Sequence, residues 1–225
     1  MSYTQIDLST FPRRDHFNLF RHYTNPYVGV TVEVDITSAL SSIRARELPF
    51  FLTIFHAMVK AANSVPEFRQ RIVGDGIIEY DHCDGSYVCA REDHTYCYVT
   101  PPHEDDLLRF IPIAQAEQKA ALENPALEET GDVRSQLFFS STPWFSFTSV
   151  QEPTPFPVDS NPRFLFGKYH ESQGKTLLPV HILVNHALCD GWHIHQVLSA
   201  FEENLKALTR PVNPPIPVPE ENSFF

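Results

Sequence analysis

The stretch that decides the fold is "VNHALCDGWHIHQ", residues 184–196. The run that leads into it, "TLLPVHILVNH", is apolar on both faces, which is typical of a central, doubly covered strand. From Gly191 onward the pattern changes to that of an amphipathic helix. Its apolar stripe consists of Ile194, Leu198, Phe201, Leu205 and Leu208. The stretch therefore predicts a buried strand, a turn that carries His186 and Asp190, and a helix.

Further strands and helices alternate on the N-terminal side of this stretch. We expect a half-buried strand at "YVGVTVEVDIT" and a buried helix at "PFFLTIFHAMVKAANSV" that ends before Pro66. Ser9 and Thr10 are candidate N-caps of a first helix, with Pro12 near its first turn. The "DDLLRFIPIAQAEQKAALEN" run predicts another helix, with an irregularity at Pro112.

The remaining segments favour strands and hairpins. "GDG" at 74–76 predicts a hairpin turn, and "ESQGK" at 171–175 predicts a hairpin loop, because strand-like runs flank it on both sides. "QLFFSSTPWFSFTSV" is aromatic and β-branched, so it predicts a strand that Pro143 interrupts. No repeat or linker divides the chain, so we expect one domain over residues 1–210. The Pro-rich residues 211–225 form a C-terminal extension.

Composition excludes several classes of protein. The 225 residues are 42% hydrophobic and carry a formal net charge of -11, so we expect no general attraction for nucleic acid or anionic lipid. The N-terminus lacks the apolar run of a signal peptide, and no stretch of about 18 apolar residues predicts a membrane span. The four cysteines form no Cys-x-x-Cys pair. These features predict a cytoplasmic protein with free thiols.

The turn at His186 admits two interpretations. In the structural one, Asp190 caps the helix and His186 is a core histidine with its hydrogen bonds satisfied. In the functional one, His186 emerges neutral from a strand end and takes a proton from a bound hydroxyl, while Asp190 fixes the local backbone. Ser140 and Ser141 lie just before a Pro-Trp corner and offer hydroxyl donors for a developing oxyanion, as acyl transfer requires.

Four segments together resemble the chloramphenicol acetyltransferase family. "HALCDG" at 186–191 is similar to its active-site motif and "SSTPWFSFTS" at 140–149 to its oxyanion-serine segment. "DLSTFPRRDHF" resembles its N-terminal helix, and "PEFRQRIVGDGIIEYD" its central hairpin. The resemblance runs from about residue 3 to residue 207. It implies an α/β fold, a two-layer sandwich with a mixed β-sheet of the CoA-dependent acyltransferase superfamily. It also implies a homotrimer with active sites at the subunit interfaces.

The resemblance also implies roles for individual residues. His186 matches the catalytic general base, Ser140 the serine that stabilises the oxyanion, and Asp190 the structural aspartate that pairs with Arg13. Three residues match positions on the coenzyme A side: Trp144, Lys168 and Tyr169. The implied reaction is direct transfer of acetyl from acetyl-CoA to a hydroxyl of chloramphenicol or a related small molecule, without a metal or an acyl-enzyme.

The residues that match the acceptor pocket depart from the family's pattern. They are Phe20, Tyr96, Cys97 and Val150. Phe20 stands where tyrosine is common, and Cys97 where phenylalanine is usual, although Tyr96 or Tyr98 could compensate by a shift. The other departures are Gln151 and Glu152 after "PWFSFTS", Leu165 for threonine, Asn185 for histidine, and Pro49 and Phe51 for a lysine and a tyrosine near coenzyme A. These departures predict a pocket poorly matched to chloramphenicol, unless another aromatic set rebuilds it.

Three other functions stay open at this point. A metal site is one, with the candidate ligands His181, His186, Cys189, His193 and His195, but their spacing does not follow the zinc rules. The catalytic domain of dihydrolipoyl acyltransferases is another, because it shares the His-x-x-x-Asp-Gly motif. The third is a non-catalytic trimer that binds a hydrophobic small molecule. The joint presence of His186, Ser140 and Arg13 argues against it.

Overall fold

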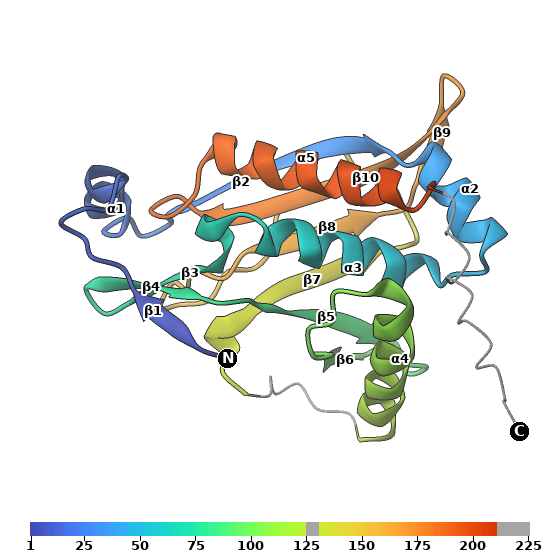
Figure 1. Cartoon of the computed structure of the whole chain (residues 1–225), viewed down its shortest axis with the longest axis horizontal. Coiled ribbons are helices and arrows are strands. Elements are labelled where there is room, and N and C mark those ends of the chain that lie inside the picture. The colour runs from blue at the N-terminus through green and yellow to red at the C-terminus, as the bar shows by residue number, and fades with distance from the viewer. Residues whose placement is uncertain (125–130, 211–225) are drawn as a thin grey trace, which may run out of the picture.

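The structure is a computed structural model that describes residues 1–124 and 131–210 (Figure 1). The Pro-rich extension predicted for residues 211–225 lies outside the described residues. The α-helices are α1 (Arg14–Phe20), α2 (Thr37–Ala45), α3 (Phe50–Asn63), α4 (Leu107–Glu123) and α5 (Gly191–Ala207). Two short 3-10 helices are η1 (Pro66–Arg69) and η2 (Val133–Ser135).

Seven strands form a large mixed sheet. They are β2 (Tyr27–Asp35), β5 (Asp84–Ala90), β6 (Tyr96–Val99), β7 (Gln136–Thr142), β8 (Arg163–Gly167), β9 (His170–Ser172) and β10 (Lys175–Asn185). Their order is β2-β10-β8-β7-β5-β6, with β9 paired to β10. The β5–β7 and β7–β8 pairs are parallel and the others antiparallel. Strand β10 pairs with β2 on one side and β8 on the other, which confirms the predicted central strand.

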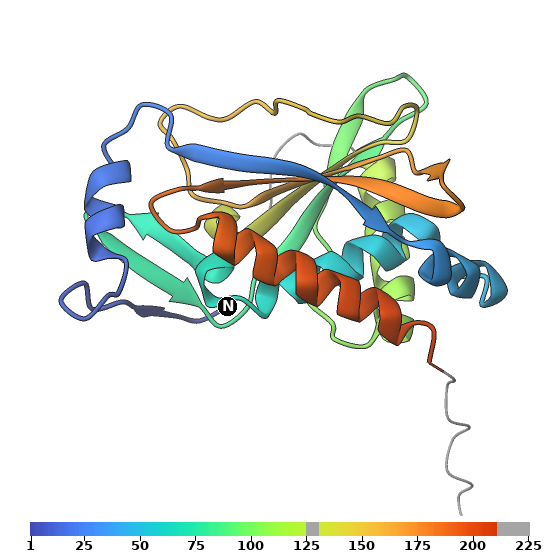
Figure 2. The same cartoon turned by 90° about the horizontal axis from the view of Figure 1, so that it is seen from above.

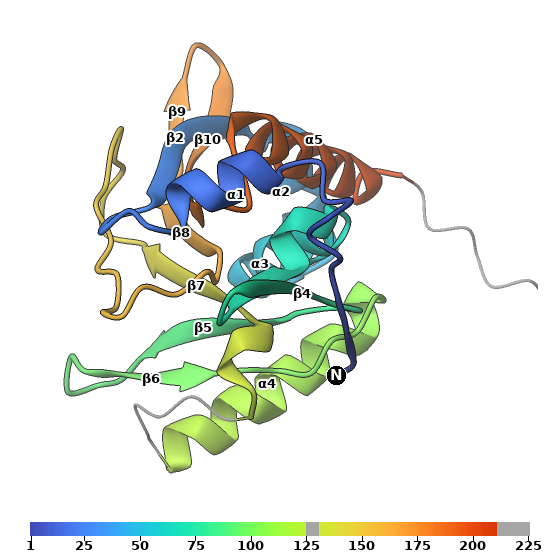
Figure 3. The ribbon, with the colours of Figure 1, turned by 90° about the vertical axis from the view of Figure 1, so that its left-hand side faces the viewer.

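The helices α3 and α5 pack against each other on one face of this sheet (Figure 3). Figure 2 shows α5 crossing in front of the sheet, with the segment that follows β7 on the opposite side. Gly85 lets α3 approach β5, because a Cβ at that position would lie 2.4 Å from the Phe55 ring. Phe139 stacks on Phe164, with ring centroids 4.6 Å apart, and the edge of Phe55 meets Phe139 at 4.7 Å. The confirmed α/β sandwich therefore has an aromatic core between helices and sheet.

A small antiparallel sheet lies at one end of the molecule. It has the order β1-β4-β3, from β1 (Tyr3–Gln5), β4 (Gly76–Tyr80) and β3 (Gln70–Val73). The predicted hairpin turn is confirmed, and Gly74 adopts φ +58° in it, a conformation that glycine adopts without a Cβ clash. Arg71 is 1% exposed and ties this sheet to the large one. Its guanidinium donates to the carbonyl oxygens of Phe68, Gln70, Arg134 and Gln136.

Some local predictions were wrong. Ser9 and Thr10 do not cap the first helix, which begins at Arg14 with Arg13 as the N-cap. Their hydroxyls are engaged earlier, because Ser9 donates to the Asp7 carboxylate and Thr10 to the Asp7 carbonyl. The short elements β1, α2 and β9 were not predicted. Helix α4 is continuous through Pro112, where the sequence predicted an irregularity.

Candidate active site

His186 lies in the turn between β10 and α5, held in one tautomer. Its Nδ1 is 2.9 Å from the carbonyl oxygen of Cys189. A carbonyl oxygen only accepts hydrogen bonds, so Nδ1 carries the proton in this contact. In the neutral form of the imidazole, this contact leaves Nε2 unprotonated, and Nε2 makes no hydrogen bond to any residue in the described ranges 1–124 and 131–210. That nitrogen is suited to remove a proton from a hydroxyl.

The N-terminal segment fixes the orientation of the His186 ring. Phe20 at the end of α1 stacks on it, with ring centroids 4.1 Å apart and an interplanar angle of 21°. The His186 backbone N–H donates to the Pro26 carbonyl, over an N···O distance of 2.7 Å. Phe20, which was predicted to line the acceptor pocket, therefore packs against the His186 ring and offers it no hydroxyl.

Asp190 holds the turn in two ways, as the N-cap of α5 and as the partner of Arg13. Its Oδ1 accepts the Trp192 backbone N–H at 3.0 Å and caps α5. Its Oδ2 forms the predicted ion pair with Arg13, which is thereby confirmed. Arg13 also reaches the His186 carbonyl, 3.4 Å away. Burial opposes ionisation of Asp190, but the Arg13 and Trp192 hydrogen bonds outweigh it and lower its pKa to about 2.

His193 extends this ion pair into a network that the sequence pattern missed. Its Nδ1 lies 2.8 Å from Asp190 Oδ1, and its Nε2 lies 3.6 Å from Glu67 Oε1. The Glu67 contact raises the pKa of His193 against the opposing effect of burial. The signal was present, because His193 is the third residue after an N-cap aspartate, where a side chain can complete a capping box. The sequence had suggested it only as a metal ligand.

Ser140 lies on the open face of the sheet, away from the helices. It pairs with Leu165 on β8, and Leu165 pairs with His181 on β10, so the three residues share one row. Neighbouring strand residues point to opposite faces. Ser141 therefore belongs to the row of the core residue Phe166. The structure thus separates two adjacent hydroxyls that only the family resemblance had distinguished.

The structure does not bring Ser140 and His186 together within one chain. Ser140 is aligned with His181, two strands away, and His186 lies five positions beyond His181 along the β10 direction. At ordinary strand spacings this places the two side chains roughly 15–20 Å apart. A site that uses both residues therefore needs a second copy of the chain.

The residues expected on the coenzyme A side gather at the end of β7 and β8, at the opposite end of the sheet from His186. Trp144 follows β7 and is 70% exposed. The Lys168 backbone N–H donates to the Phe145 carbonyl at 3.0 Å, which ties the two strand ends together. The hydroxyl of Tyr169 accepts from Arg44 at 3.4 Å, and its ring meets the Phe50 ring edge-on.

A cavity of 320 Å³ opens on the same face of the sheet as Ser140. Val150, one of the predicted pocket residues, lines it together with the segment from Thr148 to Thr154. Its floor comes from β2 and β10, through Tyr27, Gly29, Thr31, His181 and Leu183. A cavity of this size is at the lower end of the range for small-molecule sites, about 300–1,000 Å³.

Cys97 does not belong to this face, which corrects its assignment to the acceptor pocket. Its side chain is 0% exposed within the hydrophobic core. The strand alternation instead places Tyr98, which pairs with Val88, on the open face. Tyr96 is also on that side and is 46% exposed. Tyr96 or Tyr98 can therefore supply the aromatic ring that Cys97 lacks, which is the alternative that the sequence left open.

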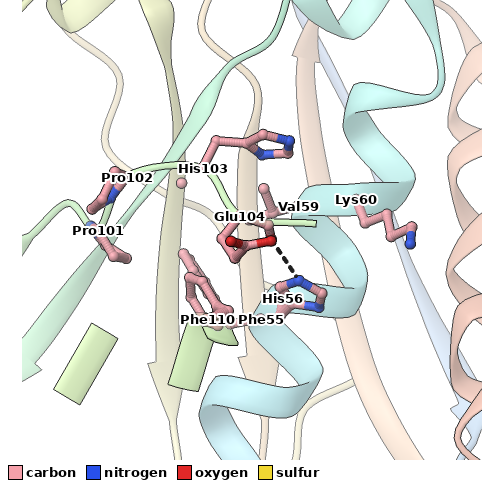
Figure 4. Close-up of a pocket in the computed structure, with 10 residues that line it drawn as sticks. Phe55, His56, Val59, Lys60, Pro101, Pro102, His103, Glu104 and Phe110 are labelled. Atoms are coloured by element: carbon pink, nitrogen blue, oxygen red, sulfur yellow. Dashed lines mark hydrogen bonds between the residues drawn. The ribbon is translucent and has the colours of Figure 1, made fainter. Parts of the chain in front are cut away.

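A second cavity lies on the helix side, where α3 meets the segment after β6 (Figure 4). His56 points into it and its Nε2 is 2.8 Å from the Glu104 carbonyl oxygen. The cavity holds only about 10 Å³, roughly the space of one water molecule, so it is too small for a substrate. Within residues 1–124 and 131–210, no group of three or more histidine, cysteine or acidic residues is arranged to hold a metal ion.

Comparison with known proteins defines first the class and then the family. The probable dihydrolipoamide acetyltransferase of Listeria monocytogenes superposes with a TM-score of 0.63 at 16% identity, covering 87% of this chain and 90% of that one. This likeness shows that the two chains share a fold. A solved chloramphenicol acetyltransferase superposes with a TM-score of 0.78 at 25% identity, over 91% of this chain and 100% of the other.

The sequence comparisons identify the family. The chloramphenicol acetyltransferase of Klebsiella sp is 29% identical over 204 residues, which cover 89% of this chain and 93% of the relative. The chloramphenicol acetyltransferase family matches residues 1–202. The chain therefore belongs to the chloramphenicol acetyltransferase family and is an acyltransferase, as the resemblance predicted. In the part of the chain that the structure describes, no helix is long and apolar enough to cross a membrane.

Proposed function

We propose that this protein transfers acetyl from acetyl-CoA to a hydroxyl of chloramphenicol or a related small molecule. The observation that carries the proposal is the contact of His186 Nδ1 with the Cys189 carbonyl, which leaves Nε2 as the base. Family membership supports the same reaction and disfavours a non-catalytic binding protein.

The reaction needs no covalent enzyme intermediate. His186 Nε2 takes the hydroxyl proton as the acceptor oxygen attacks the thioester carbonyl carbon. Ser140 donates a hydrogen bond to the oxyanion of the tetrahedral intermediate. The C–S bond then breaks, the ester leaves, and the proton on His186 passes to the sulfur of coenzyme A. General-base help contributes about 10²–10⁴-fold and an oxyanion donor about 10²–10³-fold.

The site is assembled between copies of the chain, and a homotrimer is the assembly proposed. The separation of Ser140 and His186 within one chain supports this arrangement. In it, His186 of one copy faces the open sheet face of the next, where Ser140 and the 320 Å³ cavity lie. Coenzyme A approaches from the strand ends that carry Trp144, Lys168 and Tyr169.

Chloramphenicol is the acceptor that the family relationship favours. The departures at Phe20, Val150, Leu165 and Asn185 still predict a lower efficiency with this drug than with another hydroxylated compound. Loss of one polar or aromatic contact costs about 1–3 kcal/mol, so a rebuilt pocket with Tyr96 or Tyr98 would restore ordinary efficiency.

The decisive experiment is a thiol-release assay with acetyl-CoA and a panel of hydroxyl acceptors that includes chloramphenicol. We expect ester formation by the wild type and almost none by His186→Ala. His94→Asn, which changes an exposed histidine in the β5–β6 turn, is the matched control and keeps full activity. If His186→Ala retains a large share of the turnover, the assigned base is wrong. Efficient acetylation of chloramphenicol at micromolar concentration would contradict the predicted mismatch between the acceptor pocket and this drug. It would leave the proposed acetyl transfer intact.

A further inference from the structure

Glu152 lines the cavity on the open face of the sheet, and one of its carboxyl oxygens has no hydrogen-bond partner among the described residues. It belongs to the segment after β7 that lines this cavity. Its Oε1 is buried and makes no hydrogen bond within the described ranges 1–124 and 131–210. A buried polar atom without a partner is costly, and it is usually explained by a ligand or a water that completes it. The wall of the cavity therefore contains a carboxyl group that the described residues leave short of one hydrogen-bond donor.

The charges around Glu152 do not supply that donor. The charge of Arg163 lowers the pKa of Glu152, but the Arg163 guanidinium is engaged elsewhere. It donates to the two Asp159 carboxylate oxygens, at 2.9 and 2.6 Å. The Tyr27 hydroxyl also donates to Asp159, at 3.0 Å. His181 in the cavity floor shares Nδ1 with the Thr31 hydroxyl at 2.9 Å. Burial lowers the pKa of His181, so this ring is neutral at pH 7.

The cavity thus carries negative charge without a positive side chain among its lining residues. Burial raises the pKa of Glu152 to about 7, an effect that Arg163 only partly offsets. A cation placed beside this carboxyl would favour its ionised form. Binding of such a cation would release a proton.

The cavity also lies on the same face of the sheet as Ser140, the oxyanion donor of the proposed reaction. Its floor residues Thr31 and His181 face each other across β2 and β10, and His181 shares a row with Leu165 and Ser140. Ser140 is therefore about two strand spacings, roughly 10 Å, from the cavity floor. An acceptor whose hydroxyl lies at Ser140 can extend its far end toward Glu152.

We infer that the acceptor of this enzyme carries a cationic amino group in addition to its hydroxyl, and that Glu152 selects for that group. This inference rests on the proposed acetyl transfer and specifies its substrate class. It assigns Glu152 a contact with the substrate and no part in the bond-making steps.

Two probes that share one scaffold test the inference. The first is the amino diol that remains when the dichloroacetyl group of chloramphenicol is removed, and the second is the uncharged N-acetyl form of the same diol. Their affinities are measured by calorimetry at pH 7 without acetyl-CoA, for the wild type and Glu152→Gln. Glu171→Gln, which neutralises an exposed glutamate on β9, is the control variant. Circular dichroism checks that each variant is folded.

We expect the wild type and Glu171→Gln to bind the amine at least about tenfold more tightly than its N-acetyl form, the effect of one charge-assisted contact. In Glu152→Gln this ratio should fall to within about twofold. Equal affinities in the wild type, a preference for the uncharged form, or an unchanged ratio in Glu152→Gln would each overturn the inference. The binding ratio does not depend on turnover. A wild type that binds the amine selectively but forms no ester with any acceptor would refute the proposed function alone.

Discussion

Ser140 on β7 is aligned with His181 on β10, two strands away, whereas His186 lies five residues beyond His181, in the turn that follows β10. No side-chain rotation closes such a gap. The hydroxyl belongs to the open face near the strand ends that carry Trp144, whereas the imidazole emerges at the other end beside α1. Each chain therefore holds two half-sites.

Mixing two inactive variants should restore activity if the half-sites meet between copies. His186→Ala subunits still supply Ser140, and Ser140→Ala subunits still supply His186. Random assembly of equal amounts into a closed ring gives about one quarter of the sites both residues, and so about one quarter of wild-type activity. The measurement is thiol release after the two proteins are co-expressed with different tags and co-purified. Activity no higher than that of the separate variants would show that the site lies within one chain.

Ser140→Ala should lower kcat by roughly 10²–10³-fold with little change in the affinity for acetyl-CoA. The donor matters when charge develops on the thioester oxygen and contributes little to the ground state. Ser141→Ala is the matched control, because this neighbouring hydroxyl belongs to the core-facing row of Phe166. Steady-state kinetics and acetyl-CoA titration measure both effects. Parallel losses of kcat and affinity would argue that Ser140 binds the cofactor instead.

Arg13→Ala should destabilise the protein by about 2–3 kcal/mol and reduce kcat. The side chain of Arg13 is 13% exposed and that of Asp190 is 30% exposed, so the loss is smaller than the roughly 3–5 kcal/mol of a fully buried pair. Adjacent Arg14 is 55% exposed and forms an ion pair with the exposed Asp15, so Arg14→Ala should change stability by less than about 0.5 kcal/mol. Urea unfolding compares the variants, and equal effects of the two would mean that the Asp190 pair is not structural.

The contribution of His193 to stability should fall as the pH rises. The pKa of His193 is raised in the folded protein by Glu67 and Asp190, against burial and the Arg13 charge. Its contribution is therefore full below the unfolded value of 6.5 and is lost as the pH passes the higher folded value. Urea unfolding of the wild type and His193→Gln at pH 6 and pH 9 should show a smaller difference at the higher pH. A difference that grows with pH would reverse the assigned charge state.

Arg71→Met should cost about 3 kcal/mol or more in the free energy of unfolding, because it leaves several buried carbonyl oxygens without donors. Arg71 acts on stability alone, so the folded fraction of Arg71→Met should show the same pH profile of activity as the wild type. Arg109→Met, at a side chain that is 73% exposed, is the control and should be nearly neutral. Chemical denaturation measures the difference, and a neutral Arg71→Met would mean that water replaces the guanidinium.

The sequence was a reliable guide where long-range burial and local periodicity agree. The buried central strand β10, the stripe from Ile194 to Leu205, and the turn at Gly74 all appear where they were predicted. Short elements were missed, because three residues such as Tyr3–Gln5 form a strand only when another strand is beside them. Ser9 and Thr10 were assigned as caps because residue type alone does not reveal that Asp7 engages them first.

By itself, the sequence determined the strand–turn–helix at His186, the pairing partner of Arg13 through resemblance, and the two adjacent candidates Ser140 and Ser141. These follow from chain order and from local periodicity. Only the tertiary structure decided that Ser140 faces outward and Cys97 inward, that His193 joins Asp190 to Glu67, and that Ser140 and His186 stay apart in one chain. The physical reason is that sheet register and strand order set which faces and ends meet, and both depend on pairings between residues far apart in the sequence.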